Sequence, residues 1–311
     1  MPFAIGGNSR IRTNIPAENA YNALDVSNRD ISLRQLRLST GLRINNAADD
    51  VAGYITARAL LARNGSLQSA MNTVGDAKNV TSIAMDALDN INSLITKIKD
   101  STAQAASGAL GTDEKIALAK ASYRMAQQIQ TIVDSTVFSG SQLIDGTFSG
   151  TFIVGFNAQN SLLTITVDIR ANNPDFNIES NNFNVNSLNT NIFAGITGLD
   201  LRQLDEVNSA DLGIYSFSNI GTTLTSLSLA LNNANKVASF LGGIQNRLDS
   251  QEDLLRTQIT NYKAAISRIE DADVAKEQLS LIKSQFLQQA SLTSLAQANQ
   301  NPSSFLQLIR G

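Results

Sequence analysis

The sequence contains no cysteine, histidine or tryptophan. Without cysteine and histidine the chain cannot form disulfides, thiolate nucleophiles, Ser-His-Asp triads or zinc sites of the usual ligand types. Aromatic residues make up 5% of the chain, a composition that suits helix packing better than a catalytic cleft. We therefore expect neither an enzyme activity nor a cofactor.

Charge and hydropathy exclude two further classes. The net charge is -3, so we expect no bulk attraction to nucleic acid or to an anionic membrane. No apolar run approaches the roughly 18 residues that a membrane span needs, so no membrane insertion is expected. The first residues, MPFAIGGNSRIRTN, lack the apolar middle of a secretory signal. A role outside the cell would require export without a cleaved leader.

Residues 224–269 show the clearest pattern. Apolar residues recur there at spacings of three and four, which a helix with a 3.5-residue seam can use and a strand cannot. A helix of this length would be roughly 65–70 Å long, too long for the core of one compact domain, so it needs other long helices as partners. The predicted seam is Leu224, Leu227, Leu231, Ala234, Ala238, Leu241, Leu248, Leu255, Ile259, Tyr262, Ile266 and Ile269.

The rest of the chain offers those partners. A second long helix is predicted to end near Ala105, and a third to start with Thr112 or Asp113 as its cap. Near the two termini the apolar stripes are narrow, so both helices are marginal alone and are expected to pair with each other. The seam of the second helix is Val80, Ile83, Ala87, Ile91, Leu94 and Ile98; the terminal stripes are Ala17, Leu24, Ile31 and Leu38, and Ala275, Leu279, Ile282, Phe286 and Ala290.

Two stretches interrupt the helices. Residues 39–53 form a break, where Gly41 can adopt positive φ and Asp49 or Asp50 can cap the next helix. Capping explains these aspartates better than metal binding, since no third ligand is near. Residues 152–156 and 162–169 read as a β-hairpin, followed by a segment rich in asparagine.

The predicted fold class is mainly α: a long antiparallel coiled-coil or helical-bundle rod with a small β-hairpin region in the middle of the chain. Residues 1–42 and 274–311 would form a terminal coiled-coil domain. Residues 43–170 and 205–273 would form a helical rod domain with the hairpin, and 171–204 an irregular surface segment.

Five blocks of the sequence resemble bacterial flagellin, the subunit of the flagellar filament. They are RLSTGLRINNAADDVAG (37–53), TVFSGSQLIDG (136–146), LGGIQNRLDS (241–250), SRIEDADVAKE (267–277) and QFLQQASLTSLAQANQ (285–300). The resemblance implies a secreted, extracellular homopolymer used for swimming, with the terminal helices as its inner core and the outer variable domains absent or vestigial. It also implies as partners the flagellar export apparatus, a C-terminal-binding export chaperone, the filament cap and hook-junction proteins.

The expected assembly interface consists of Leu24, Ile31, Leu38, Arg43, Asp273, Leu279, Ile282, Phe286 and Leu295. Within it, we expect Arg43 to contact Glu270, Asp271 or Asp273, in the same subunit or a neighbour. In some flagellins a Toll-like receptor reads the second long helix. By ungapped alignment Lys97 and Gln104 keep the residue types used there, whereas Ser101 replaces a leucine.

Three alternatives remain at this point. A hook–filament junction protein shares the layout, although QNRLD and LAQANQ resemble flagellin proper. A flagellin-like surface protein that binds glycans would use the Asn-rich segment, which offers few stacking aromatics. An enzyme domain in the middle of the chain is disfavoured, because that region has no histidine and is too short. A calcium loop at Asp271, Asp273 and Glu277 is disfavoured as well, because the run lacks the central glycine of such a loop.

Overall fold

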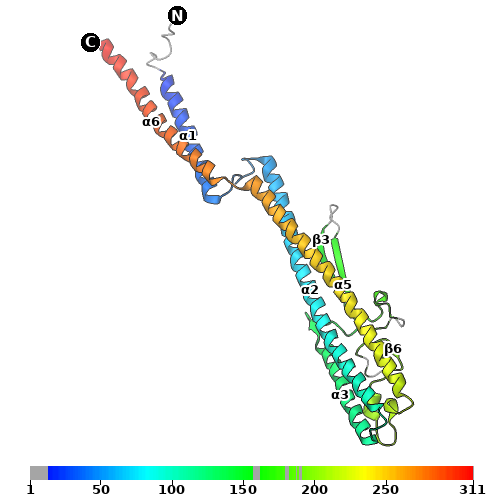
Figure 1. The fold of residues 1–311 in the computed structure, drawn as a ribbon. Helices are drawn as coiled ribbons and strands as arrows, with labels where there is room; N and C mark the ends of the chain where they lie inside the picture. Colours follow the sequence, from blue (N-terminus) through cyan, green and yellow to red (C-terminus); the bar gives the residue numbers. More distant parts are fainter. Residues whose placement is uncertain (1–12, 157–161, 179–181, 187, 189–190, 311) are drawn as a thin grey trace. The chain divides into compact units, whose positions relative to one another are not determined.

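The computed structural model describes residues 13–310 except 157–161, 179–181, 187 and 189–190. Its elements confirm the mainly α fold with a small β region (Figure 1). The helices are α1 (Ile15–Thr40), α2 (Val51–Ala105), α3 (Thr112–Ser135), α4 (Gln203–Glu206), α5 (Ile220–Glu270) and α6 (Val274–Arg310), with 3-10 turns η1 (Pro174–Phe176) and η2 (Gly213–Tyr215).

Three antiparallel strand pairs lie between α3 and α5. They are β1 (Val137–Phe138) with β2 (Ser141–Gln142), β3 (Ser149–Phe156) with β4 (Leu162–Asp168), and β5 (Ile192–Phe193) with β6 (Ile196–Thr197). The β3–β4 pair is the predicted hairpin. Its register shifts between Ile153 and Gly155, so a bulge interrupts the ladder there.

The chain divides into two compact units. The terminal unit comprises residues 1–65 and 260–311, and the central unit comprises 66–259. Helices α2 and α5 contribute the segments 51–65 and 260–270 to the terminal unit.

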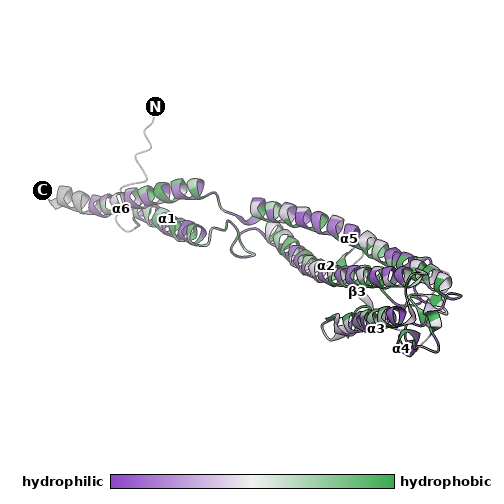
Figure 2. Ribbon diagram, turned by 60° about the horizontal axis from the view of Figure 1, so that its bottom comes forward, coloured by the Kyte–Doolittle hydropathy of each residue, from purple (hydrophilic) through white to green (hydrophobic). Residues whose placement is uncertain are grey.

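The central unit is built on α2 and α5, which run antiparallel. Asn92 Nδ2 donates to Asn235 Oδ1 over 3.1 Å, and Lys78 Nζ pairs with Glu252 Oε2 at 2.7 Å. Polar and apolar residues are interspersed along both helices (Figure 2). Apolar side chains buried on α5 follow a strict three–four spacing, which is the repeat of a helical seam: Leu227, Ala230, Ala234, Val237, Leu241, Ile244 and Leu248.

The predicted seams of α2 and α5 were wrong at several positions. On α5, Leu231 and Ala238 are half-buried, and Ala230 and Val237 are fully buried in their place. On α2, Ile83 is exposed, whereas Ala84 is fully buried. Neighbouring apolar residues offered two phases of the same period, and packing against the partner helix selects one.

Helix α3 and the turn before α5 close one end of the central unit. The hydroxyl of the buried Tyr215 lies 2.7 Å from Ser122 Oγ and accepts a hydrogen bond from Thr102 Oγ1 at 3.2 Å. The predicted cap of α3 was wrong: the N-cap is Gly111, which has no side chain to cap with, and Thr112 and Asp113 lie inside the helix.

The segment 171–204 was expected to be an irregular surface segment, but its described residues include η1, β5 and β6 and several buried side chains. Phe176, Phe183 and Phe193 are buried, and Phe176 makes an edge-on contact with Phe240 of α5 at 5.2 Å between ring centroids. Asn233 Nδ2 of α5 donates to the Ala194 carbonyl over 2.9 Å. The Phe176 ring and the Ala194 carbonyl therefore anchor the segment to α5.

Candidate assembly surface

The terminal unit is built on α1 and α6, which lie side by side (Figure 1). Three long-range hydrogen bonds set an antiparallel register. Asn14 Nδ2 donates to the Ala298 carbonyl at 2.8 Å, and Gln288 Nε2 donates to Asn28 Oδ1 at 2.7 Å. At the other end, Arg34 Nη1 donates to Glu277 Oε2 at 2.8 Å. The predicted pairing of the two terminal helices is thus present in the structure.

The seam between α1 and α6 combines polar and apolar side chains. Buried or half-buried side chains along it include Ser27, Arg34, Glu277, Ser284 and Gln288. The Glu277 carboxylate lies within 3.4 Å of both Arg34 and Arg37 guanidinium groups, and its side chain is 9% exposed. Among the apolar residues described there, only Ala20, Leu281 and Ala298 are buried, and the larger ones of α1 along the seam are half-buried, so this seam buries its apolar side chains less completely than α5 does.

The apolar stripe predicted for α6 faces away from α1. Leu279, Ile282 and Phe286 are 69%, 54% and 74% exposed, and their spacing of three and four places them on one face of the helix. By contrast Leu295 is half-buried, as are Leu24, Ile31 and Leu38 on α1. Leu279, Ile282 and Phe286, which were expected to belong to the assembly interface, are thus left uncovered by α1 within this chain.

Helix α1 also leaves apolar side chains uncovered. Tyr21, Val26 and Leu36 are exposed. Scattered apolar residues on a surface are ordinary, but a contiguous apolar face marks an interaction site. Leu279, Ile282 and Phe286 form such a face on α6, so the terminal unit leaves an apolar surface uncovered by its own chain.

The connector between α1 and α2 packs on the connector between α5 and α6 as two short antiparallel strands of chain. Leu42 forms a β-bridge with Asp271. The backbone N–H of Arg43 donates to the Glu270 carbonyl at 2.6 Å, and that of Ala272 donates to the Gly41 carbonyl at 2.8 Å. Gly41 has φ 73°, so this turn requires the conformation that glycine adopts at least cost.

Arg43 contacts the facing connector through a carbonyl. Its guanidinium donates from Nη2 to the Ile269 carbonyl at 2.7 Å and lies 3.5 Å from Asp50 Oδ2. Within this chain it does not pair with Glu270, Asp271 or Asp273, contrary to one form of the prediction. Asp273 instead caps α6, because its Oδ1 accepts from the Lys276 N–H at 3.1 Å.

The adjacent aspartates act as local acceptors, as expected. Asp50 Oδ1 accepts from the Gly53 N–H at 2.9 Å and so caps α2. Asp49 Oδ2 accepts from the backbone N–H groups of Asn45 and Asn46, and these bonds lower the pKa of the Asp49 carboxyl. In the described ranges, no group of three or more acidic side chains is placed to hold a metal ion.

The residues of the predicted receptor-like face lie on α2. Lys97 and Gln104 are exposed, and Ser101 is half-buried. The structure thus leaves the first two accessible, while the side chain at 101 is short and partly covered.

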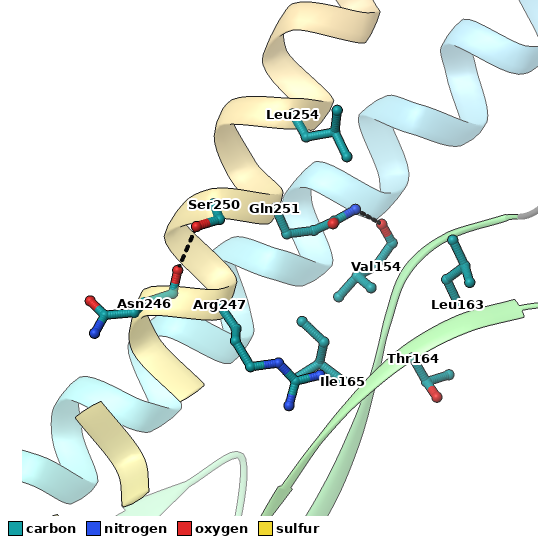
Figure 3. Close-up of a pocket in the computed structure, with 9 residues that line it drawn as sticks. All are labelled: Val154, Leu163, Thr164, Ile165, Asn246, Arg247, Ser250, Gln251 and Leu254. Atoms are coloured by element: carbon teal, nitrogen blue, oxygen red, sulfur yellow. Dashed lines mark hydrogen bonds between the residues drawn. The ribbon is translucent and has the colours of Figure 1, made fainter. Parts of the chain in front are cut away.

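A groove of about 580 Å³ separates the β3–β4 hairpin from α5 (Figure 3). Gln251 reaches across it from α5, and its Nε2 donates to the Val154 carbonyl at 2.9 Å. This bond satisfies a carbonyl at the bulge of β3. Leu163 and Leu254 remain about half exposed on its walls, so sequence analysis missed a second apolar surface whose members are far apart in the chain.

Within the described ranges, none of the helices combines the length and apolarity that a membrane-spanning segment needs. The geometry defines a class of protein: a helical structural subunit whose central unit has a buried core and whose helix α6 keeps an exposed apolar face. Two family models match the chain, the bacterial flagellin N-terminal helical region over residues 11–149 and the C-terminal helical region over 224–309.

Curated relatives match over nearly the whole chain. A flagellin of Bacillus subtilis is 30% identical, with 97% of this chain and 100% of the relative covered, and a flagellin of Halalkalibacterium halodurans is 28% identical over 96% and 99%. A solved flagellar hook-associated protein of Vibrio parahaemolyticus covers 72% of this chain and 100% of its own, at 15% identity and a TM-score of 0.56; this likeness concerns the fold alone. The chain belongs to the bacterial flagellins and is a structural subunit that polymerises into the filament used for motility.

Proposed function

We propose that the exposed stripe of Leu279, Ile282 and Phe286 on α6 is the main contact between neighbouring copies in the filament. The single observation that supports it most is that these three large apolar side chains lie exposed on one face of α6, away from α1. Burying one such side chain is worth about 1.5–3 kcal/mol. Repeated in every subunit, that gain would drive assembly.

Phe286→Ser tests this proposal. Because Phe286 is 74% exposed, the melting temperature of the monomer should stay unchanged, while the critical concentration for filament growth should rise about ten- to a hundredfold. Sedimentation of filaments over a concentration series measures it. Lys283→Ser is the matched control on the same helix, and it should assemble normally. Growth of the Phe286 variant at the wild-type concentration would contradict the proposal.

The remaining assembly residues belong to the same proposal. Leu24, Ile31, Leu38 and Leu295 would hold α1 to α6, while Arg43 and Asp273 would fix the connector. Arg43→Ala removes the bond to the Ile269 carbonyl, and Asp273→Lys removes the cap of α6. Each variant should alter filament shape or swimming with little change in monomer melting. Wild-type waveforms in both variants, across pH and salt, would show that the connector is passive.

We further propose that the chain acts outside the cell without catalytic activity, and that residues 1–42 with 274–311 form the inner core domain and 43–170 with 205–273 the outer one. Export and assembly of the chain would then require the flagellar export apparatus, a chaperone that binds the C-terminal helix, a filament cap and hook-junction proteins. Deletion of the export apparatus should retain the chain inside the cell. Its appearance in the medium of such cells would contradict this route.

Recognition by a Toll-like receptor is proposed to be weak. Lys97 and Gln104 are exposed, but the half-buried Ser101 offers no large apolar side chain, and a leucine there would add about 1.5–3 kcal/mol if buried against a receptor. Ser101→Leu should therefore raise activation in a cell reporter assay with monomer. Full potency of the unmodified chain would contradict the proposal.

A further inference from the structure

The terminal unit contains a basic pocket of about 400 Å³ beside the connector. Five basic side chains line it: Arg34, Arg37, Arg43, Arg268 and Lys276. They come from α1, the connector, the end of α5 and the start of α6, so folding of the unit is what brings them together. Three acidic side chains also line the pocket, which leaves the walls with a positive excess.

The acidic residues of the pocket do not neutralise all of its basic side chains. Glu277 serves both Arg34 and Arg37, and Asp273 Oδ1 caps α6. Asp271 is exposed and contributes its backbone to the bridge with Leu42. In the part of the chain that the structure describes, neither Arg268 nor the side chain of Lys276 has a carboxylate within ion-pair distance.

Two donors in the pocket walls lack acceptors. The Nε–H groups of Arg34 and Arg37 are buried without a hydrogen-bond partner, and buried donors of this kind are rare because they cost free energy. Helix α6 begins at Val274, at the edge of the pocket, and its N-terminal dipole adds positive potential there. The unpaired cations and the helix dipole favour a ligand with several anionic oxygens, and the unsatisfied donors belong to arginines of the same walls.

We propose that this basic pocket binds an oxyanion, supplied either as free phosphate or sulfate or as a carboxylate from a neighbouring copy. Guanidinium groups bind such oxygens through two parallel hydrogen bonds, and Lys276 would act as a point charge. The bound oxyanion would tie α1 to the start of α6 across the connector. Occupancy would then set how firmly the two connectors hold together, independently of the apolar stripe.

Amide hydrogen exchange with inorganic phosphate as the probe tests the proposal, at constant ionic strength against chloride. Phosphate at ten times its dissociation constant should slow exchange about tenfold in residues 34–43 and 268–280 of the monomer. Exchange in residues 227–248 of the central unit should not change. That internal comparison separates site binding from the general strengthening of burial by phosphate, which would slow both regions.

The variants decide whether this pocket is responsible. Arg268→Gln with Lys276→Gln should abolish the local protection, whereas the control Lys263→Gln with Lys283→Gln removes the same charge from outside the pocket and should retain it. If added phosphate protects these residues in both monomer and filament, the pocket takes a free anion.

If added phosphate protects them in the monomer alone, a neighbour's carboxylate already fills the pocket in the filament. If phosphate protects them in neither state, or protects the pocket variant equally, the proposal is wrong. Filament growth is measured separately, because it tests the apolar stripe and not this pocket.

Discussion

The two units use the same helical period for opposite purposes. In the central unit, residues at the three–four spacing of α5 are apolar and buried against the rest of the unit. In the terminal unit, the α1–α6 seam mixes polar side chains with half-buried apolar ones, and the apolar stripe of α6 lies on the outside. The comparison teaches that an apolar stripe identifies a buried surface without telling whether the chain buries it alone or with its neighbours.

The largest expected effect concerns the seam of α5. Leu248 is fully buried, so Leu248→Ala should destabilise the central unit by about 2–5 kcal/mol through lost burial and the cavity left behind. Thermal unfolding of the monomer measures it. Leu229→Ala, on the exposed face of the same helix, is the control and should change little. Equal melting temperatures of the two variants would mean that the seam has been misplaced.

The terminal unit should respond most to its shared carboxylate. Glu277→Gln leaves Arg34 and Arg37 facing each other without a negative charge, which should cost about 1–3 kcal/mol. We expect filaments of this variant to dissociate at a lower temperature and α1 to exchange its amides faster. Glu18→Gln, an exposed acid in the first turn of α1, is the comparison. If both variants behave like the wild type, the polar side chains of the seam contribute nothing to the pairing of the helices.

A smaller effect is expected from pH in the central unit. The hydrogen bond from Lys78 lowers the pKa of the Glu252 carboxyl, and those to Asp249 and Glu252 raise the pKa of Lys78. The Glu252 contribution is present above its ordinary pKa of 4.5 and is lost as pH falls through the lowered folded value. The Lys78 contribution is present below 10.5 and is lost as pH rises through the raised value.

Glu252→Gln should therefore flatten the loss of stability between neutral and acid pH. The change should stay within about 1 kcal/mol, because both side chains are partly exposed. Asp253→Asn on the same helix is the control, and its acid profile should match that of the wild type. If all three proteins lose stability equally as the pH falls, the ion pairs of Lys78 contribute nothing to the free energy of unfolding.

The comparison also shows what the sequence could predict. Periodicity predicted the approximate bounds of α2 and α5. The glycine at position 41 predicted a turn with positive φ in the break between helices. Apolar character alone could not choose between Ala230 and Leu231, because both positions fit a helical seam. It also could not reveal that Ser27, Ser284 and Gln288 meet in a seam, since polar residues at helical spacing usually read as a solvated face.

The middle of the chain was harder for a different reason. The described residues of 171–204 form only the short elements η1, β5 and β6 before α4 begins, so their burial does not follow a helical period. Phe176, Phe183 and Phe193 are buried, and Phe176 packs edge-on against both Phe183 and Phe240 of α5. Likewise, the basic pocket gathers residues from both ends of the chain, and only folding shows that Arg34 and Arg268 share it.

Amide hydrogen exchange, compared between monomer and filament, tests the central claim most directly. In the monomer, α1 and α6 should exchange fast, because a partly polar seam and an uncovered stripe give little protection, while residues 227–248 of α5 should exchange slowly. In the filament, α1 and α6 should become slow, and α5 should change little. Equal protection of α1 and α6 in the two states would contradict the account, since it would mean that the terminal unit is complete without its neighbours.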